Sequence, residues 1–189
     1  MLEINFSPFP VINTQRLVLR RINKDDAPAI FKLRSLDATM KYIDREKQQT
    51  VEEALAFVSM INDLVDSNSS INWAIALGDT PDELIGTIGF WRIIKEHYRA
   101  EVGYMLHPVH WNKGIMKEAL LSAVQYGFGP MQLHSIEAHI NPANAASAAL
   151  LEKTGFVREA YFKEDYFFRG NFIDTAIYSL LTDQNTPKR

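Results

Sequence analysis

The chain of 189 residues is 47% hydrophobic and 23% charged, a composition typical of a soluble globular protein built as one domain. Its net charge of −3 and pI near 6.0 exclude a general basic surface for nucleic acid, and the absence of cysteine excludes disulfides, thiol nucleophiles and cysteine-bound metals. Because no apolar run reaches membrane-spanning length and the first residues lack a secretory signal, we expect a soluble cytoplasmic protein without direct nucleic-acid or membrane partners.

The first half of the chain carries two helix-start signals among strand patterns. Asn23 is a suitable helix cap, because acids follow it and Pro28 falls early, where proline is tolerated. Thr50 and Glu53 have the spacing of a capping box before an apolar run. The predicted elements are a loosely packed, proline-containing arm (1–13), a strand (16–22), a helix after Asn23, a helix after Thr50, and antiparallel strands (71–77 and 84–94).

A strand, a turn and a helix are predicted between residues 101 and 128. From Glu101 to Leu106 the residues alternate with the period of a half-buried strand. Pro108 ends this strand, because proline cannot donate a ladder hydrogen bond. Beyond Gly114 the residues follow the spacing of an amphipathic helix as far as Phe128.

The residue pattern in the last third of the chain predicts a strand, a helix and a β-hairpin. Asn144 begins the helix, and Gly155 suits the left-handed position after its end. This order of elements indicates a mixed α/β fold in a single domain spanning residues 1–189. The predicted elements are a strand (134–140), a helix (144–151), two hairpin strands (157–168 and 172–181) around a turn (169–171), and a tail (182–189).

The turn between the central strand and helix is a candidate anion site. A glycine where a helix begins lets backbone amides converge on a phosphate, because the first N–H groups of a helix lack partners. Gly114 has this position, and Lys113 adds positive charge beside it. The alternative is an ordinary strand-to-helix turn in which Gly114 serves packing alone.

Residues 101–108 and 111–119 resemble motif A of the GNAT superfamily of N-acetyltransferases, most closely its ribosomal-protein (RimJ/RimL-like) branch. Residues 14–21, Thr-Gln-Arg-Leu-Val-Leu-Arg-Arg, resemble the start of that branch. The resemblance implies an α/β single-domain fold with a mixed sheet of about seven strands, splayed in the middle and flanked by about four helices. It also implies that main-chain amides of the turn hold the diphosphate of acetyl-CoA. Trp111 and Met116 depart from the family pattern, which has Gln or Arg at the first place and Gly or Ala at the last.

The run Asn144-Ala-Ala-Ser147, with Leu150 to Phe156 behind it, resembles motif B of the same family. The resemblance implies that Asn144 hydrogen-bonds the pantetheine arm and that Ser147 faces the cofactor sulfur. Alternatively, both are ordinary residues of a helix start, where Asn and Ser are favoured. The cofactor-binding residues implied by the two motifs are Met105, Leu106, Trp111, Asn112, Lys113, Gly114, Ile115, Met116, Lys117, Asn144 and Ser147.

Acetyl transfer to an amine needs a neutral amine, a held oxyanion and a leaving thiolate. Glu101 is the candidate base, acting directly or through water; its alternative reading is a solvated charge at the start of a strand. Main-chain N–H groups on the Met105–Leu106 side could hold the acetyl oxygen. Ser147 could protonate the leaving sulfur, with Tyr104 and Tyr166 as weaker proton-transfer candidates.

No catalytic metal is expected. Pro108 falls between His107 and His110 and disfavours a helical pair of metal ligands there. His134 and His139 fall on opposite faces of a strand, and there is no His-Glu-x-x-His run.

The leading hypothesis is an acetyl-CoA-dependent N-acetyltransferase that acts on a protein N-terminal α-amine, such as that of a ribosomal protein, by direct attack in a ternary complex. About one α-amine in ten is neutral at pH 7, against well under one lysine in a thousand, so an α-amine depends less on a base. The alternatives are acetylation of a small amine (an amino acid, polyamine or antibiotic) and a non-catalytic acyl-CoA-binding sensor. The acceptor would contact residues 14–43, 90–99 and 161–171, in a monomer or a homodimer.

Overall fold

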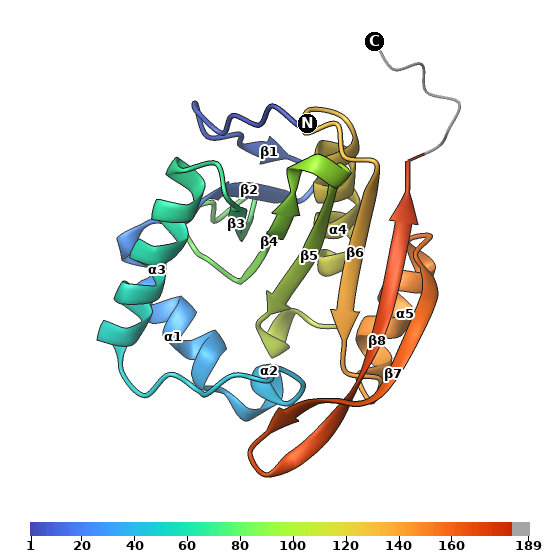
Figure 1. The fold of residues 1–189 in the computed structure, drawn as a ribbon. Coiled ribbons are helices and arrows are strands. Elements are labelled where there is room, and N and C mark those ends of the chain that lie inside the picture. Colours follow the sequence, from blue (N-terminus) through green and yellow to red (C-terminus); the bar gives the residue numbers. More distant parts are fainter. Residues whose placement is uncertain (183–189) are drawn as a thin grey trace.

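Eight strands form one mixed sheet in the computed structural model, which describes residues 1–182. The strand order is β1-β2-β3-β4-β5-β6-β8-β7, and every neighbouring pair is antiparallel except β5 and β6 (Figure 1). Most of the expected tail, residues 183–189, lies outside the described residues. The strands are β1 (Ile12–Asn13), β2 (Leu17–Arg21), β3 (Ile71–Leu77), β4 (Gly86–Ile94), β5 (Arg99–Leu106), β6 (Ser135–Ile140), β7 (Val157–Phe168) and β8 (Asn171–Leu181).

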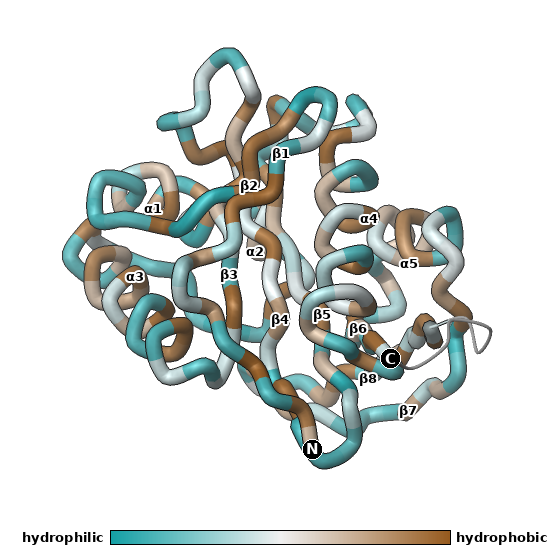
Figure 2. Tube along the Cα trace, turned by 90° about the horizontal axis from the view of Figure 1, so that it is seen from above, coloured by the Kyte–Doolittle hydropathy of each residue, from teal (hydrophilic) through white to brown (hydrophobic). Residues whose placement is uncertain are grey.

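Helices cover both faces of the sheet. Figure 2 shows α1 and α3 on one side of the strands and α4 and α5 on the other. The core lies between these layers, and its largest buried side chain is Trp73 on β3. The α-helices are α1 (Ala27–Ser35), α2 (Asp37–Met40), α3 (Val51–Asp66), α4 (Ile115–Phe128) and α5 (Ala145–Lys153).

The predicted helix starts are confirmed. The Asn23 side chain accepts a hydrogen bond from Asp25 N and begins a short 3-10 turn that leads into α1. Thr50 Oγ1 accepts from Glu53 N at 3.3 Å and caps α3. Gly155 follows α5 with φ +93°, the left-handed conformation predicted for it. These starts and stops have local causes, which explains why they are visible in the sequence.

Strands β5 and β6 pair over only three residues and then separate. Their parallel ladder joins Arg99–Glu101 to Ser135–Glu137, although both strands continue beyond it. The strands are connected through α4, which packs Gly127 against Phe90 of β4 and Ile136 of β6. The result is a split in the centre of the sheet that opens toward the C-terminal ends of both strands (Figure 1). The splayed sheet predicted from the family resemblance is therefore present.

One expectation about the fold needs correction. The N-terminal arm is not loosely packed, because Leu2 and Phe6 are 5% and 3% exposed and Leu2 N donates to Lys95 O. The expected sheet of about seven strands with about four helices is present, and the short β1 and the short α2 are the additional elements. Neither β1 nor α2 is long enough to leave a periodic signal in the sequence.

Gly89 on β4 gives a test of the close packing of β4 against β3. A Cβ at Gly89 would lie 2.3 Å from the carbonyl oxygen of Ile71, a backbone atom that cannot move aside cheaply. We expect Gly89→Ala to lower the free energy of unfolding by about 1–3 kcal/mol. Gly78→Ala is the matched control, because its Cβ would meet nothing closer than 3.5 Å. Urea denaturation followed by circular dichroism measures both; equal midpoints for the two variants would contradict the packing argument.

Candidate active site

The turn before α4 has the backbone form of an anion cradle. Asn112 and Gly114 both have positive φ, +59° and +73°, which bends the chain sharply into the helix. No side chain caps α4 at Gly114, and the first backbone hydrogen bond of the helix runs from Glu118 N to Gly114 O. The N–H groups of Ile115, Met116 and Lys117 are thus the ones that a helix start leaves without intrahelical partners. They can donate to a bound phosphate.

The remaining side chains of the turn divide into anchors and exposed groups. Ile115 is 5% exposed and fixes the helix start to the core, and Met116 packs against the core from a partly buried position. Lys113 and Lys117 are exposed. The Trp111 indole donates to Leu106 O at 2.8 Å, so it ties the turn to the end of β5. Trp111 therefore has a structural contact that accounts for its difference from the usual family pattern.

The backbone edge of β5 along the split is free to bind a ligand. In an antiparallel ladder, alternate residues direct their N–H and C=O groups to the same neighbour. His107 N donates to Ile85 O beside β4, so Met105 also directs its amide to β4. The N–H groups of Tyr104 and Leu106 consequently face the split. Met105 and Leu106 are the residues predicted to hold the acetyl oxygen. Only the Leu106 amide of these two lies on the open edge, and the Tyr104 amide lies there as well.

Tyr104 and Ser147 meet beside the split. Their hydroxyl oxygens are 2.7 Å apart, and Ser147 N donates to Asn144 Oδ1 at 3.1 Å, so Asn144 caps α5. Ser147 is only 7% exposed. Burial raises the pKa of Tyr104 to about 12, although the hydrogen bond with Ser147 opposes the shift. Tyr104 is therefore neutral at physiological pH and is available as a proton donor.

Glu101 lies on the other face of β5. It is three residues from Tyr104, and side chains of a strand alternate between its faces. Glu101 Oε2 is 3.2 Å from Arg92 Nε, and its side chain is 18% exposed. It is opposite Glu137 in the last rung of the β5–β6 ladder. The predicted base and the predicted acid thus occupy opposite faces at the start of the split and do not contact each other.

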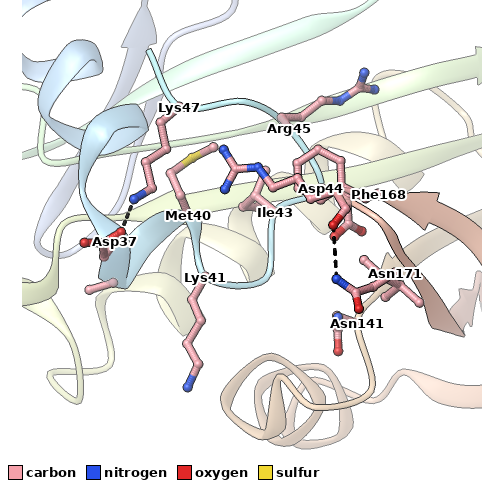
Figure 3. Close-up of a pocket in the computed structure, with 13 residues that line it drawn as sticks. Asp37, Met40, Lys41, Ile43, Asp44, Arg45, Lys47, Asn141, Phe168 and Asn171 are labelled. Atoms are coloured by element: carbon pink, nitrogen blue, oxygen red, sulfur yellow. Dashed lines mark hydrogen bonds and ion pairs between the residues drawn. The ribbon is translucent and has the colours of Figure 1, made fainter. Parts of the chain in front are cut away.

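A cavity of about 670 Å³ lies between the segment 37–47 and the tip of the β7–β8 hairpin (Figure 3). Asn141, directly after β6, belongs to its lining, so the cavity adjoins the open end of the split. Phe168, Asn171 and Ile173 contribute from the hairpin. The segment 37–47 contributes Asp37, Ala38, Met40, Lys41, Ile43, Asp44, Arg45 and Lys47.

Contacts across the cavity hold its two walls together. Arg169 at the hairpin tip pairs with Glu46, with Nε to Oε1 at 3.1 Å, and the Tyr166 hydroxyl lies 3.5 Å from Asp44 O. Tyr166 therefore contacts the segment 37–47, whereas Tyr104 is the tyrosine that contacts Ser147. Both walls overlap segments expected to contact the acceptor (14–43 and 161–171), but no sequence signal predicts the cavity itself, because its walls are more than 120 residues apart in the chain.

Within residues 1–182, no group of three or more His, Asp or Glu side chains has the geometry of a metal site. None of the helices in the same range is both long and apolar enough to cross a membrane.

Residues 16–157 match the family described as Acetyltransferase (GNAT) domain. The chain belongs to this family. It is 38% identical over 173 residues to the uncharacterized N-acetyltransferase YoaA of Bacillus subtilis, which covers 92% of this chain and 97% of YoaA. It is 27% identical over 186 residues to the [ribosomal protein uS5]-alanine N-acetyltransferase of Escherichia coli, covering 94% of each. The spermidine N-acetyltransferase of Vibrio cholerae, solved with CoA and spermine, superposes with a TM-score of 0.78 at 25% identity, over 89% of this chain and 96% of that one.

GNAT membership makes the chain an N-acetyltransferase that uses acetyl-CoA. The residues present fit this cosubstrate. The turn at Gly114 offers amides that no side chain caps, and the split leaves the Tyr104 and Leu106 amides on an open edge. Acetyl-CoA suits this combination, because it has a diphosphate that the turn can bind and a chain with amides that can pair with the open strand edge.

The burial of Tyr104 predicts a pH effect on stability. Between pH 10 and 12 this side chain ionises in the unfolded chain but stays protonated in the folded protein, so the folded state binds more protons and stability falls as pH rises. Tyr104→Phe should remove this part of the loss, a difference of up to about 2–3 kcal/mol over that range. Urea denaturation at a series of pH values from 9 to 11.5 tests it. The same slope in the wild type and the variant would mean that Tyr104 is not held neutral.

Proposed function

We propose that the protein acetylates the N-terminal α-amine of a peptide or protein whose first residues are neutral or acidic. The charge around the candidate acceptor cavity carries this proposal. Four basic and two acidic side chains line it: Lys41, Arg45, Lys47 and Arg169 against Asp37 and Asp44.

Local pairing of these charges leaves the cavity with a positive excess. Lys47 pairs with Asp37, and Arg169 pairs with Glu46. No ion pair reaches Lys41 or Arg45 within residues 1–182, and Asp44 is the lining carboxylate left to attract a cation. Burial raises the pKa of Asp44, although the charge of Arg45 opposes the shift. A polyamine or a strongly basic tail would meet repulsion here, whereas a single ammonium next to neutral or acidic residues would not.

Polar groups of the cavity suit a peptide. Asn141 and Asn171 can donate to and accept from a peptide backbone. A peptide also presents one α-amine with a pKa near 7.8, so a useful fraction is neutral without a strong base. Glu101, through water, receives the proton that the amine loses as its nitrogen bonds to the acetyl carbon. The Tyr104 and Leu106 amides stabilise the negative charge that develops on the acetyl oxygen.

On the other face of β5, Ser147 supports departure of the thiolate. As the carbon–sulfur bond breaks, the Ser147 hydroxyl donates its proton to the sulfur, and Tyr104 replaces that proton across the 2.7 Å contact. The pKa of about 12 keeps Tyr104 protonated until this moment. The acid and the base act from opposite sides of the strand, so they do not neutralise each other.

A compact apolar amine is the second candidate. Met40, Ile43, Phe168 and Ile173 give the cavity an apolar part that could bind a hydrocarbon or aromatic group. Such a substrate would pack against these apolar side chains, but Lys41 and Arg45 would then have no role in binding it.

Ser147→Ala tests the proton donor. General acid catalysis is typically worth 10²–10⁴-fold, but a thiolate is already a tolerable leaving group, so we expect kcat to fall by about tenfold to a few hundredfold. The KM for acetyl-CoA should change little, because the lost bond forms mainly as the sulfur leaves. Asn144→Ala is the companion variant and should chiefly weaken cofactor binding. A raised KM with unchanged kcat in Ser147→Ala would identify Ser147 as a binding residue instead.

Acceptor charge is tested with a peptide series that shares its first residue and carries acidic, neutral or basic residues at positions two to four. Free thiol release and mass spectrometry of the product report turnover, with spermidine and an aromatic amine included for comparison. The wild type should prefer the acidic peptide to the basic one by about tenfold or more in kcat/KM. The double variant Lys41→Glu and Arg45→Glu should reverse this order, whereas Lys24→Glu, an exposed residue outside the cavity, should not. Preference for spermidine by the wild type would refute the proposal.

A further inference from the structure

The segment before β2 reaches across to the first turn of α4. Glu118 accepts three hydrogen bonds from it: Thr14 Oγ1 to Oε1 at 2.6 Å, Arg16 N to Oε1 at 2.9 Å and Arg16 Nε to Oε2 at 2.7 Å. Arg16 Nη1 also donates to Lys113 O at 2.9 Å, inside the turn itself. We call these four residues the Arg16 clamp. It joins parts of the chain that are about 100 residues apart in sequence.

Charge and hydrogen bonding keep the clamp intact at neutral pH. Burial alone would raise the pKa of Glu118, but the hydrogen bonds from Thr14 and Arg16 and the charge of Arg16 outweigh it and lower the pKa below its usual value. The carboxylate is therefore ionised and paired. Its side chain is 19% exposed, against 47% for Arg16, so the acid is the more sheltered partner.

The clamp determines which way the turn directs its amides. The Lys113–Gly114 peptide is planar and trans, so its C=O and N–H point in opposite directions. Because the Lys113 carbonyl points to Arg16, the Gly114 N–H points away from β2. The guanidinium also lies close to the turn, since Arg16 Nη2 is 3.4 Å from the place that a Cβ of Gly114 would take.

We propose that Arg16 is a positioning residue for the diphosphate of acetyl-CoA. It holds the 112–117 turn in the form that aims its N–H groups at the phosphates, and it neutralises Glu118, which would otherwise place an unpaired carboxylate in the first turn of α4. This inference rests on the assignment of the 112–117 turn to the cofactor. It also gives a physical role to Thr14 and Arg16, two residues of the N-terminal stretch that resembles the start of the ribosomal branch.

Direct binding, measured by isothermal titration calorimetry, separates this role from catalysis. The probes are coenzyme A, which carries the diphosphate, and S-acetyl-pantetheine, which lacks it. Arg16→Gln should weaken coenzyme A binding by about tenfold or more, because charge-assisted hydrogen bonds that fix the turn are lost and Glu118 is left unpaired. Binding of S-acetyl-pantetheine should stay within about twofold of the wild type.

Two further variants test the charge argument. Glu118→Gln should weaken coenzyme A binding less than Arg16→Gln, because it loosens the clamp without leaving a negative charge near the phosphates. The double variant Arg16→Gln and Glu118→Gln should bind coenzyme A more tightly than Arg16→Gln alone. The matched control is Arg21→Gln at the end of β2, whose side chain is 40% exposed against 47% for Arg16 and pairs with Asp66 outside the clamp. It should leave both affinities unchanged.

The outcomes are distinct. Coenzyme A affinity within twofold of the wild type in Arg16→Gln would overturn the inference, and so would an equal loss of both probes, which would mark a purely structural role. If Arg16→Gln does not fold, Arg16→Lys serves instead, since it keeps the charge but cannot bridge Lys113 and Glu118 together. A wild type that fails to bind coenzyme A would overturn the cofactor assignment as well. A wild type that binds it but acetylates no peptide would refute the proposed function alone.

Discussion

The early end of the β5–β6 ladder is the constraint on which the site depends. Backbone N–H and C=O groups left unpaired inside a protein are costly, and sheets normally leave few of them. Here two strands that begin as neighbours part after the rung of Glu101 and Glu137, in the middle of an eight-stranded sheet. Part of this cost is avoided, because the Trp111 indole N–H donates a hydrogen bond to the Leu106 carbonyl. The remaining groups are available to a ligand that brings its own amides and carbonyls.

Two titratable residues near the split, Tyr104 and Glu101, lie on opposite faces of β5. Strand alternation sends Tyr104 toward α5 and Glu101 toward the opposite side, although the two residues are close in the chain. The proposed proton donor and the proposed base can therefore lie near one another without direct proton transfer between them. The two side chains also have different partners: Tyr104 is partly buried and bonds to the Ser147 hydroxyl, whereas Glu101 pairs with the Arg92 guanidinium.

Prediction from sequence succeeded where the cause is local. The caps at Asn23 and Thr50 and the left-handed Gly155 each act within one helical turn, so a short window of residues contains the whole explanation. The Gly114 turn is local in the same sense. The hydrogen bond between Ser147 and Tyr104 joins two elements 43 residues apart, and no local pattern in the sequence predicts it.

Prediction failed where the cause is distant or the element is short. The Arg16 clamp and the pairing of Arg169 with Glu46 join residues about 100 and 123 positions apart, and no periodicity encodes such contacts. Helix α2 has four residues, too few for an amphipathic pattern. The N-terminal arm has prolines typical of loose segments, yet Leu2 and Phe6 are buried, because tertiary packing decides the outcome there.

The walls of the candidate acceptor cavity have a consequence for how such proteins diverge. They come from the segment 37–47 and the hairpin tip, which meet each other at the surface and contribute little to the buried core. Substitutions there leave the Gly114 turn and the interior of the sheet unchanged. A lineage can therefore change the acceptor cavity through a few surface replacements while the Gly114 turn and the split are inherited intact. Of the properties of this fold, acceptor preference is therefore the one whose change disturbs the rest of the structure least.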